Sequence, residues 1–372
     1  MVVNGIVFPA ADGIAGFVNW LVSSIMGWGW VSYGFAIFFF TLFIKLMLSP
    51  LDFLNKYFSR RNQVKQQALA DEVADLEATY ANDPMAFARA RQALFQKNGV
   101  GGLGSALVAL ASLIVTMVVF FNVLGALNNI SASNINHECE ALQAVYQKYA
   151  VDDQVADVDA FKSELNEVYA ANRTSFFWIK NIWQADTPWT STMLSFNDFN
   201  NHLPEDQKLS EAGYQTIVDN LAGEYQGGNG WLLLVLLAGA TSFLSAKLAT
   251  IMNKRNAPAP KAAKKPEEII TYSMRDAKRQ NQTAQPTIDP AQMNSMMQWM
   301  MPIIMMIFAI TQTSAFAIYM ISSSLVSTVL TTLFGFLVEM IIKKQKPKLV
   351  PDKDFDPTVI NPHAKYFKGG KK

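Results

Sequence analysis

The chain has 372 residues, of which 51% are hydrophobic and only 16% are charged, and its formal net charge is +1. Its 25 Phe, 17 Met and 8 Trp exclude the soluble protein classes and indicate a membrane protein. The apolar residues gather into runs close to or above the length of about 18 to 20 residues that crosses a hydrocarbon core. We therefore expect an all-α polytopic membrane protein with five transmembrane helices.

These runs predict the segments in chain order. Residues 1–30 form an outer segment, in which the apolar stretch 14–26 is too short to span and is expected to be an interfacial helix. The other segments are expected at residues 31–53 (span one), 55–98 (a cytoplasmic helical hairpin), 103–127 (span two), 128–229 (an enlarged extracytoplasmic helical segment), 231–252 (span three), 253–298 (a cytoplasmic loop), 299–312 (span four), 315–342 (span five) and 343–372 (a basic cytoplasmic tail).

Charge between the spans predicts the orientation. Residues 55–98, 253–298 and 343–372 hold seven, eight and nine basic residues against five, four and three acidic ones, whereas residues 128–229 hold five basic and fifteen acidic residues. Because Lys and Arg near span ends remain in the cytoplasm, we expect a multi-pass cell-membrane protein with its N-terminus outside and its C-terminus cytoplasmic. No basic region precedes the first apolar stretch, so a cleaved signal peptide is not expected.

The outer segment is expected to contain two helical stretches, 138–170 and 210–225, on either side of an aromatic stretch, 176–183. Asp157 or Asp159 and Ser210 are candidate helix starts, because short polar side chains accept hydrogen bonds from free backbone N–H groups. The aromatic side chains are expected to rest on the membrane surface; substrate binding is the alternative. Cys139 is the sole cysteine and cannot form an intramolecular disulfide.

The hairpin after span one is predicted to have arms at 55–80 and 84–98. The sequence Asn82-Asp83-Pro84 breaks the helix and starts another, with Asp83 as N-cap and Pro84 at the first helical position. The second arm ends at Asn98-Gly99, and the following glycines predict a hinge. The hairpin is interpreted either as a solvated structural element or as a site of substrate capture or lipid contact, with the basic candidates Lys56, Arg60, Arg61, Arg89 and Arg91.

Span one carries a charge in an apolar run. Thr41, Lys45 and Ser49 share one helical face, and Asp52 continues it. An ammonium at the centre of a span costs at least roughly 2.5–3.5 kcal/mol, so Lys45 is expected to face protein or water. Span five has a second polar stripe, formed by Ser324, Ser327, Thr328 and Thr331. If the stripes of spans one and five face each other, they line a hydrophilic groove. The alternatives are snorkelling of Lys45 and close helix packing by small residues of span five.

Several short motifs, taken together, resemble the YidC/Oxa/Alb membrane protein insertase family. Span one begins with Trp30-Val31-Ser32-Tyr33-Gly34-Phe35-Ala36-Ile37 and ends with a basic residue followed by Ser49-Pro50-Leu51. A charged hairpin and a Gly-rich entry to span two follow. Further matches are Phe177-Trp178-Ile179 with Asp186 and Pro188 before span three, Met300-Met301-Pro302-Ile303 in span four, and Tyr319 in span five. In two departures, Lys45 replaces the usual Arg and Ser324 a frequent Asn.

The resemblance implies an insertase and chaperone without enzymatic chemistry or a cofactor. The acidic tail of a nascent membrane protein would enter the groove, attracted by Lys45, while its apolar segment moves into lipid. The implied groove residues are Thr41, Lys45, Ser49, Tyr319, Ser324, Ser327, Thr328 and Thr331. The implied partners are nascent membrane proteins, the lipid bilayer, the ribosome through the basic tail, and the Sec translocon, with no DNA.

Two other classes of function remain open: an anion transporter and a structural scaffold of a membrane complex. A transporter often has internal repeats, and none is evident in the sequence. His137, His202 and His363 are scattered, and Cys139 has no nearby set of residues for metal binding or nucleophilic attack. We therefore expect neither a catalytic nor a metal site.

Overall fold

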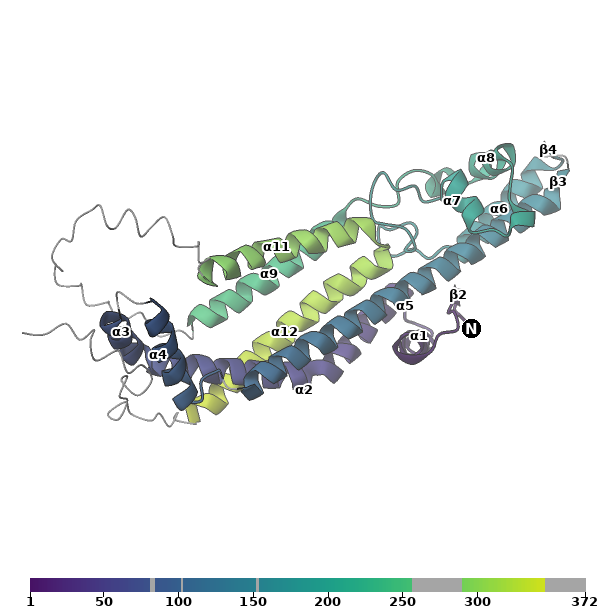
Figure 1. Ribbon diagram of the computed structural model, residues 1–372. Helices are drawn as coiled ribbons and strands as arrows, with labels where there is room; N and C mark the ends of the chain where they lie inside the picture. The colour runs from purple at the N-terminus through teal and green to yellow at the C-terminus, as the bar shows by residue number, and fades with distance from the viewer. Residues whose placement is uncertain (81–83, 102, 152–153, 256–289, 345–372) are drawn as a thin grey trace, which may run out of the picture. The chain divides into compact units, whose positions relative to one another are not determined.

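The computed structural model describes residues 1–80, 84–101, 103–151, 154–255 and 290–344. Most of these residues are helical (Figure 1): α1 (Gly13–Met26), α2 (Tyr33–Ala68), α3 (Ala70–Thr79), α4 (Pro84–Lys97), α5 (Leu103–Tyr149), α6 (Val158–Asn172), α7 (Phe196–Asn201), α8 (Glu211–Asn220), α9 (Leu233–Arg255), α11 (Pro290–Thr311) and α12 (Ser314–Lys344). Two small antiparallel pairs are β1 (Val2–Val3) with β2 (Ile6–Val7), and β3 (Ala150–Val151) with β4 (Gln154–Val155). The predicted cap Asp83 and almost all of the basic tail lie outside the described residues, as does most of the loop 253–298.

Four of the helices in the described ranges are long and apolar enough to cross a membrane, judged by length and composition: α2, α5, α9 and α12. Two shorter apolar helices are Gly13–Met26, where an interfacial helix is predicted, and Pro302–Thr311, which falls within the predicted span four. The protein is therefore a mostly helical polytopic membrane protein. The fifth span remains a prediction.

The helix of span one is longer than predicted. α2 continues through Pro50 to Ala68, so the expected hairpin arm 55–80 is not one helix. The helix ends at Ala68, Leu69 forms a turn, and α3 begins at Ala70. Leu69 is fully buried together with Leu76 and Leu94 in the small core of the hairpin, and this burial accounts for the turn at that position.

The helices contribute to two compact units. Of the described residues, those within 1–45, 119–248 and 290–328 belong to the first unit, and those within 46–118, 249–255 and 329–344 belong to the second. Because α2, α5, α9 and α12 each contribute residues to both units, the unit boundaries fall within helices.

The core of the first unit lies around the C-terminal half of α5, where α6, α7 and α8 gather (Figure 1). Its buried side chains include Leu142, Phe161, Phe199 and Ile217. The expectation of one helical stretch over 138–170 is wrong, because α5 runs on to Tyr149 and a β-hairpin separates it from α6. α7 was not predicted.

Two of the predicted helix starts in this unit are confirmed. Asp157 Oδ1 accepts a hydrogen bond from Ala160 N at 3.0 Å at the start of α6. Ser210 Oγ accepts one from Gly213 N at 3.0 Å at the start of α8. Both contacts satisfy a backbone donor of the first helical turn.

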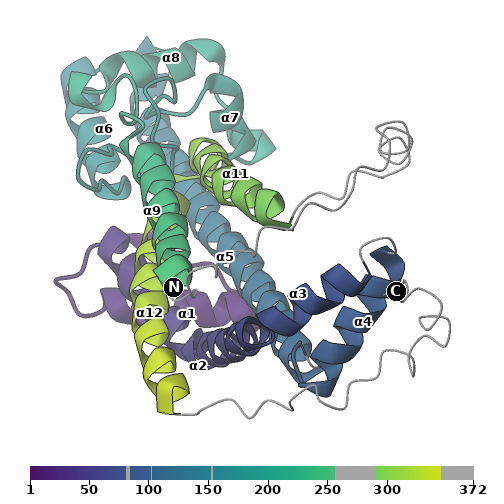
Figure 2. The ribbon, with the colours of Figure 1, turned by 90° about the vertical axis from the view of Figure 1, so that its left-hand side faces the viewer.

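In the second unit, α3 and α4 pack side by side as a hairpin (Figure 2). Lys65 of α2 holds the end of α4, since its ammonium donates to the carbonyl oxygens of Asn98 at 2.7 Å and Gly99 at 3.2 Å. A cation is favourable there, because the last carbonyl groups of a helix have no partners within the helix.

Replacing Lys65 with Met is expected to loosen the hairpin. The substitution removes two charge-assisted hydrogen bonds, so protection of the Asn98 and Val100 amides from hydrogen exchange should fall by about 1–2 kcal/mol. Gln66→Met, at the exposed neighbouring position, is the matched control and should leave the protection unchanged. Equal protection in Lys65→Met and wild type would show that Lys65 does not hold this end.

Candidate functional site

Lys45 lies at the edge of the buried face of α2. Thr41, one turn earlier, is fully buried, and its hydroxyl donates to the Ile37 carbonyl oxygen at 2.7 Å. Lys45 and Ser49 are half-buried, whereas Phe43 and the residues just after Lys45 expose large apolar side chains. The polar stripe is therefore turned away from the most apolar face of the helix, as expected for a charge that avoids lipid.

A ladder of hydroxyl groups joins α9 to α12 within the first unit. Ser242 Oγ lies 3.3 Å from Ser324 Oγ, and Ser245 Oγ donates to the Ser324 carbonyl oxygen at 3.3 Å. Ser245 also bonds the hydroxyl of Thr328, which donates to the Ser324 carbonyl oxygen at 2.7 Å. Two of the predicted groove residues, Ser324 and Thr328, thus pack and hydrogen-bond against span three, the role that the packing alternative assigns to them.

The remaining predicted groove residues differ in burial. Tyr319 is buried beside Phe316, with 5.8 Å between the ring centroids. Ser327 and Thr331 are half-buried on α12, and Thr331 and Ser49 belong to the second unit. The structure thus brings together Ser324 and Thr328 with α9, and it places Thr41 and Tyr319 in the interior.

Asp186 holds the start of α9. Its carboxylate is fully buried and accepts hydrogen bonds from Trp231 N at 2.9 Å and Leu234 N at 2.6 Å. A Cβ atom on Gly230 would lie 1.8 Å from Asp186 Oδ1, so the close approach requires glycine. The sequence marks Asp186 only through its family resemblance, because its partner helix begins 47 residues later.

The loop that precedes α9 contains Asp186 and also Asn181 and Asn229. A second polar cluster holds this loop to α5. Asn181 N donates to Asn229 Oδ1 at 2.7 Å, and Asn229 Nδ2 returns a bond to the Asn181 carbonyl oxygen at 2.8 Å. Asn181 Nδ2 donates to Glu138 Oε2 at 3.1 Å. Sequence reasoning missed this cluster, since its members are more than 40 residues apart and match no short motif.

The loop also contacts the first turns of α2 and α12. Ser314 Oγ donates to the Gln184 carbonyl oxygen at 2.6 Å, and the Trp183 ring lies 4.9 Å from the Tyr33 ring between centroids. Trp183 is only 1% exposed, so the expectation that the whole aromatic stretch rests on the membrane surface is wrong for this residue. Phe177 is 73% exposed and is the member of the stretch that fits the expectation.

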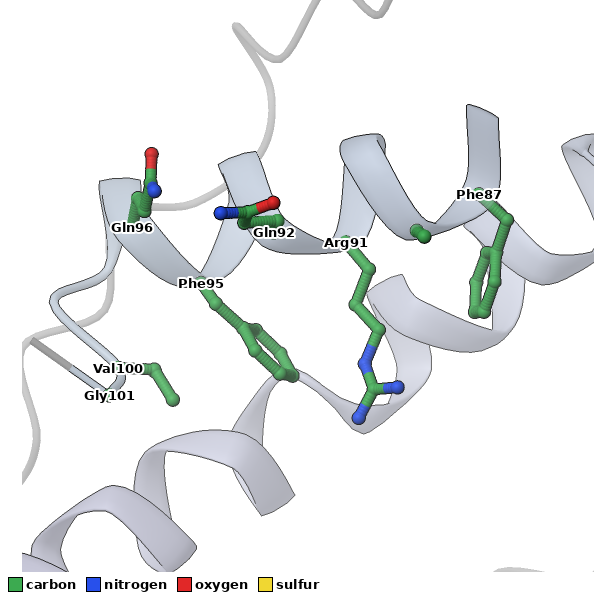
Figure 3. A pocket seen from close by; sticks show the side chains of 8 residues that line it. Phe87, Arg91, Gln92, Phe95, Gln96, Val100 and Gly101 are labelled. Carbon is green, nitrogen blue, oxygen red and sulfur yellow. The ribbon is translucent and has the colours of Figure 1, made fainter. Parts of the chain in front are cut away.

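The hairpin carries an open pocket on one face of α4, of about 430 Å³ (Figure 3). Phe87, Arg91 and Phe95 point to the same side of the helix, and the Arg91 guanidinium lies 5.1 Å from the centre of the Phe95 ring. Arg61, Arg89 and Arg91 are exposed, whereas Lys56 and Arg60 are half-buried. Within the described ranges, no cluster of three or more His, Cys, Asp or Glu residues is arranged to hold a metal ion.

A family model described as "60Kd inner membrane protein" matches residues 23–339, which include Lys45, Asp186 and Tyr319. The chain belongs to this family, the YidC/Oxa/Alb family that the motifs indicate. Two similar proteins are both called "Membrane protein insertase YidC". The one from Oceanobacillus iheyensis is 31% identical over 116 residues, 30% of this chain and 46% of the relative.

The one from Clostridium tetani is 32% identical over 111 residues, 29% of this chain and 49% of the relative. The chain thus spans about half the length of these YidC relatives. No solved structure matches it.

Proposed function

We propose that this member of the YidC/Oxa/Alb family is a membrane protein insertase and chaperone. The observation that carries the proposal is Lys45, a half-buried cation in an apolar helix of a family member, at the edge of the buried face of that helix. Insertion requires no bond chemistry. It requires a lower barrier for moving polar backbone and side chains into the membrane, where each unsatisfied polar group is costly.

In this mechanism, Lys45 attracts the acidic outer tail of a nascent membrane protein into a hydrophilic groove. Ser49, Ser327 and Thr331, which are half-buried, would offer hydroxyl groups to the tail. The hydroxyl ladder would keep α9 and α12 together while the apolar segment of the substrate passes into lipid. Thr41 and Tyr319 would shape the closed end of the groove, since both are buried.

The α4 face would make the first contact with the substrate or with lipid headgroups. Arg89 and Arg91 are exposed there, and the neighbouring Phe87 and Phe95 offer apolar surface beside the charge. The orientation follows the charge distribution, with the N-terminus outside and the C-terminus cytoplasmic. Ribosome binding by the basic tail and cooperation with the Sec translocon remain predictions from the family resemblance.

Reconstitution tests the proposal. The purified full chain in liposomes should insert a small single-span protein with an acidic outer tail, which protease protection of the tail would detect. Empty liposomes and liposomes with an unrelated multi-pass protein provide the baseline. Insertion no greater than this baseline by folded protein would overturn the insertase proposal and favour a transporter or a scaffold.

A further inference from the structure

In the second unit, α2 and α12 meet through three successive contacts. The Phe53 and Phe334 rings lie 5.6 Å apart between centroids. One turn further along, the Lys56 ammonium lies 3.7 Å from the position that a Cβ atom would take on Gly335. The last contact is an ion pair between Arg60 Nε and Glu339 Oε2 at 3.0 Å. The contacts therefore change from apolar to ionic along the two helices.

The ion pair is largely buried but keeps some exposure to solvent. The side chains of Arg60 and Glu339 are 12% and 24% exposed, so water reaches both partners. Arg60 also donates to Gln63 Oε1 at 3.4 Å, which leaves its guanidinium oriented when Glu339 leaves. Because the Arg60 side chain is largely buried, its guanidinium needs a carboxylate partner, and an incoming carboxylate can replace Glu339 without leaving that charge unpaired.

The surroundings of the pair are rich in positive charge. Lys56 lies one turn before Arg60 on the same face of α2 and opposite Gly335, and Asp52 lies one turn before Lys56. Arg61 follows directly and is exposed. Glu339 thus supplies a carboxylate to a site that is otherwise suited to an acidic ligand, and a guanidinium binds carboxylates in a planar, bidentate geometry.

We propose that Arg60 is a docking site for the acidic tail of the substrate, and that Glu339 occupies this site as a built-in competitor until the tail replaces it. The inference rests on the proposed insertase function. It adds a second contact for the acidic tail, at Arg60, and an autoinhibitory contact with Glu339 that the tail must displace. Substrates with neutral tails would gain nothing from this exchange.

Capture of the tail by the reconstituted full chain tests the inference. A photo-reactive residue in the acidic tail of the model substrate reports contact, and a second substrate carries Asn and Gln in place of the acidic residues. Glu339→Gln should raise the adduct yield of the acidic tail by about two- to fivefold, because the competing carboxylate is lost. Arg60→Gln should lower it, Arg60→Lys should retain part of it because the charge remains but the planar donor pair is lost, and Arg60→Gln with Glu339→Gln should resemble Arg60→Gln alone.

The controls separate this inference from the function itself. Glu164→Gln breaks the exposed Lys148–Glu164 ion pair and should leave capture unchanged. The neutral tail should respond to none of the variants. An equal loss of both adducts in Arg60→Gln would identify a folding defect, and the acidic-tail adduct of Arg60→Lys would then be compared with that of wild type instead. Normal insertion with no gain in Glu339→Gln would overturn the inference alone, whereas no insertion by wild type would overturn the proposed function as well.

Discussion

Asp186→Ala is expected to destabilise the start of α9 by about 3 kcal/mol. The substitution leaves the buried N–H groups of Trp231 and Leu234 without their charged acceptor, and each such bond contributes about 1.5–3 kcal/mol. The effect should appear as lost hydrogen-exchange protection of the Leu234 amide. Asp186→Asn should retain part of the protection, because the amide offers one oxygen but turns an NH₂ group toward the other donor.

Two glycine variants sharpen this prediction. Gly230→Ala should resemble Asp186→Ala, because its new Cβ would displace the carboxylate from α9. Gly223→Ala is the matched control, since a Cβ there meets no atom within 4 Å. Unchanged protection of Leu234 in Asp186→Ala would show that the carboxylate does not hold the helix start.

The second large effect is a loss of stability as pH rises, caused by Glu138. Its α5 helix has 47 residues and is about 70 Å long, whereas a hydrocarbon core is about 30 Å thick, so Glu138 lies beyond the apolar part that ends at Leu127. Burial raises the pKa of its carboxyl from 4.5 to about 8, although the Asn181 hydrogen bond and the nearby Arg173 charge oppose this rise. Tyr169 and Cys139 are the other titratable neighbours.

The sign of the effect follows from proton binding. Between pH 4.5 and about 8 the folded protein holds a proton that the unfolded chain has released, so stability falls with rising pH, by at most about 1.4 kcal/mol per pH unit. Glu138→Gln should remove this dependence and be more stable than wild type at pH 8. The measurement is the difference between the two proteins in thermal unfolding of the first unit, followed from pH 5 to 8.5.

Using this difference cancels other titrations. Burial lowers the pKa of His202, so that group makes the fold more stable as pH rises, in both proteins alike. Glu140→Gln is the matched control, because Glu140 is exposed two residues further along α5 and should leave the profile unchanged. A wild-type profile parallel to that of Glu138→Gln would contradict the assigned pKa.

The features that the sequence predicted correctly are local ones. Asp157 and Ser210 begin helices because an N-cap needs only its own side chain and the next three residues. The start of α4 at Pro84 follows from the fixed backbone angle of proline. The charge of Lys45 in an apolar run predicts a polar environment within the membrane, and the short motifs taken together indicate the family, which the family model confirms.

The features that the sequence missed depend on distant partners. The sequence predicts a span that ends at Leu127 and a separate helix from residue 138, whereas α5 runs without a break to Tyr149, where Cys139, Leu142 and Tyr146 are buried in the core of the first unit. Tryptophan is common at membrane interfaces, but Trp183 is buried against Tyr33. The stripe of span five matches a groove or a packing face equally well in sequence, and the contacts of Ser324 and Thr328 with Ser242 and Ser245 of α9 cannot be read from it.

The most direct test of the central claim is rescue of a bacterial strain depleted of its insertase. Wild type, Lys45→Arg, Lys45→Ala and Lys45→Glu would be expressed at equal levels, and insertion of a small protein with an acidic outer tail would be followed. We predict rescue by wild type and Lys45→Arg, which keep the positive charge, and failure of Lys45→Ala and Lys45→Glu. Rescue by all four variants would contradict a positively charged groove built on Lys45.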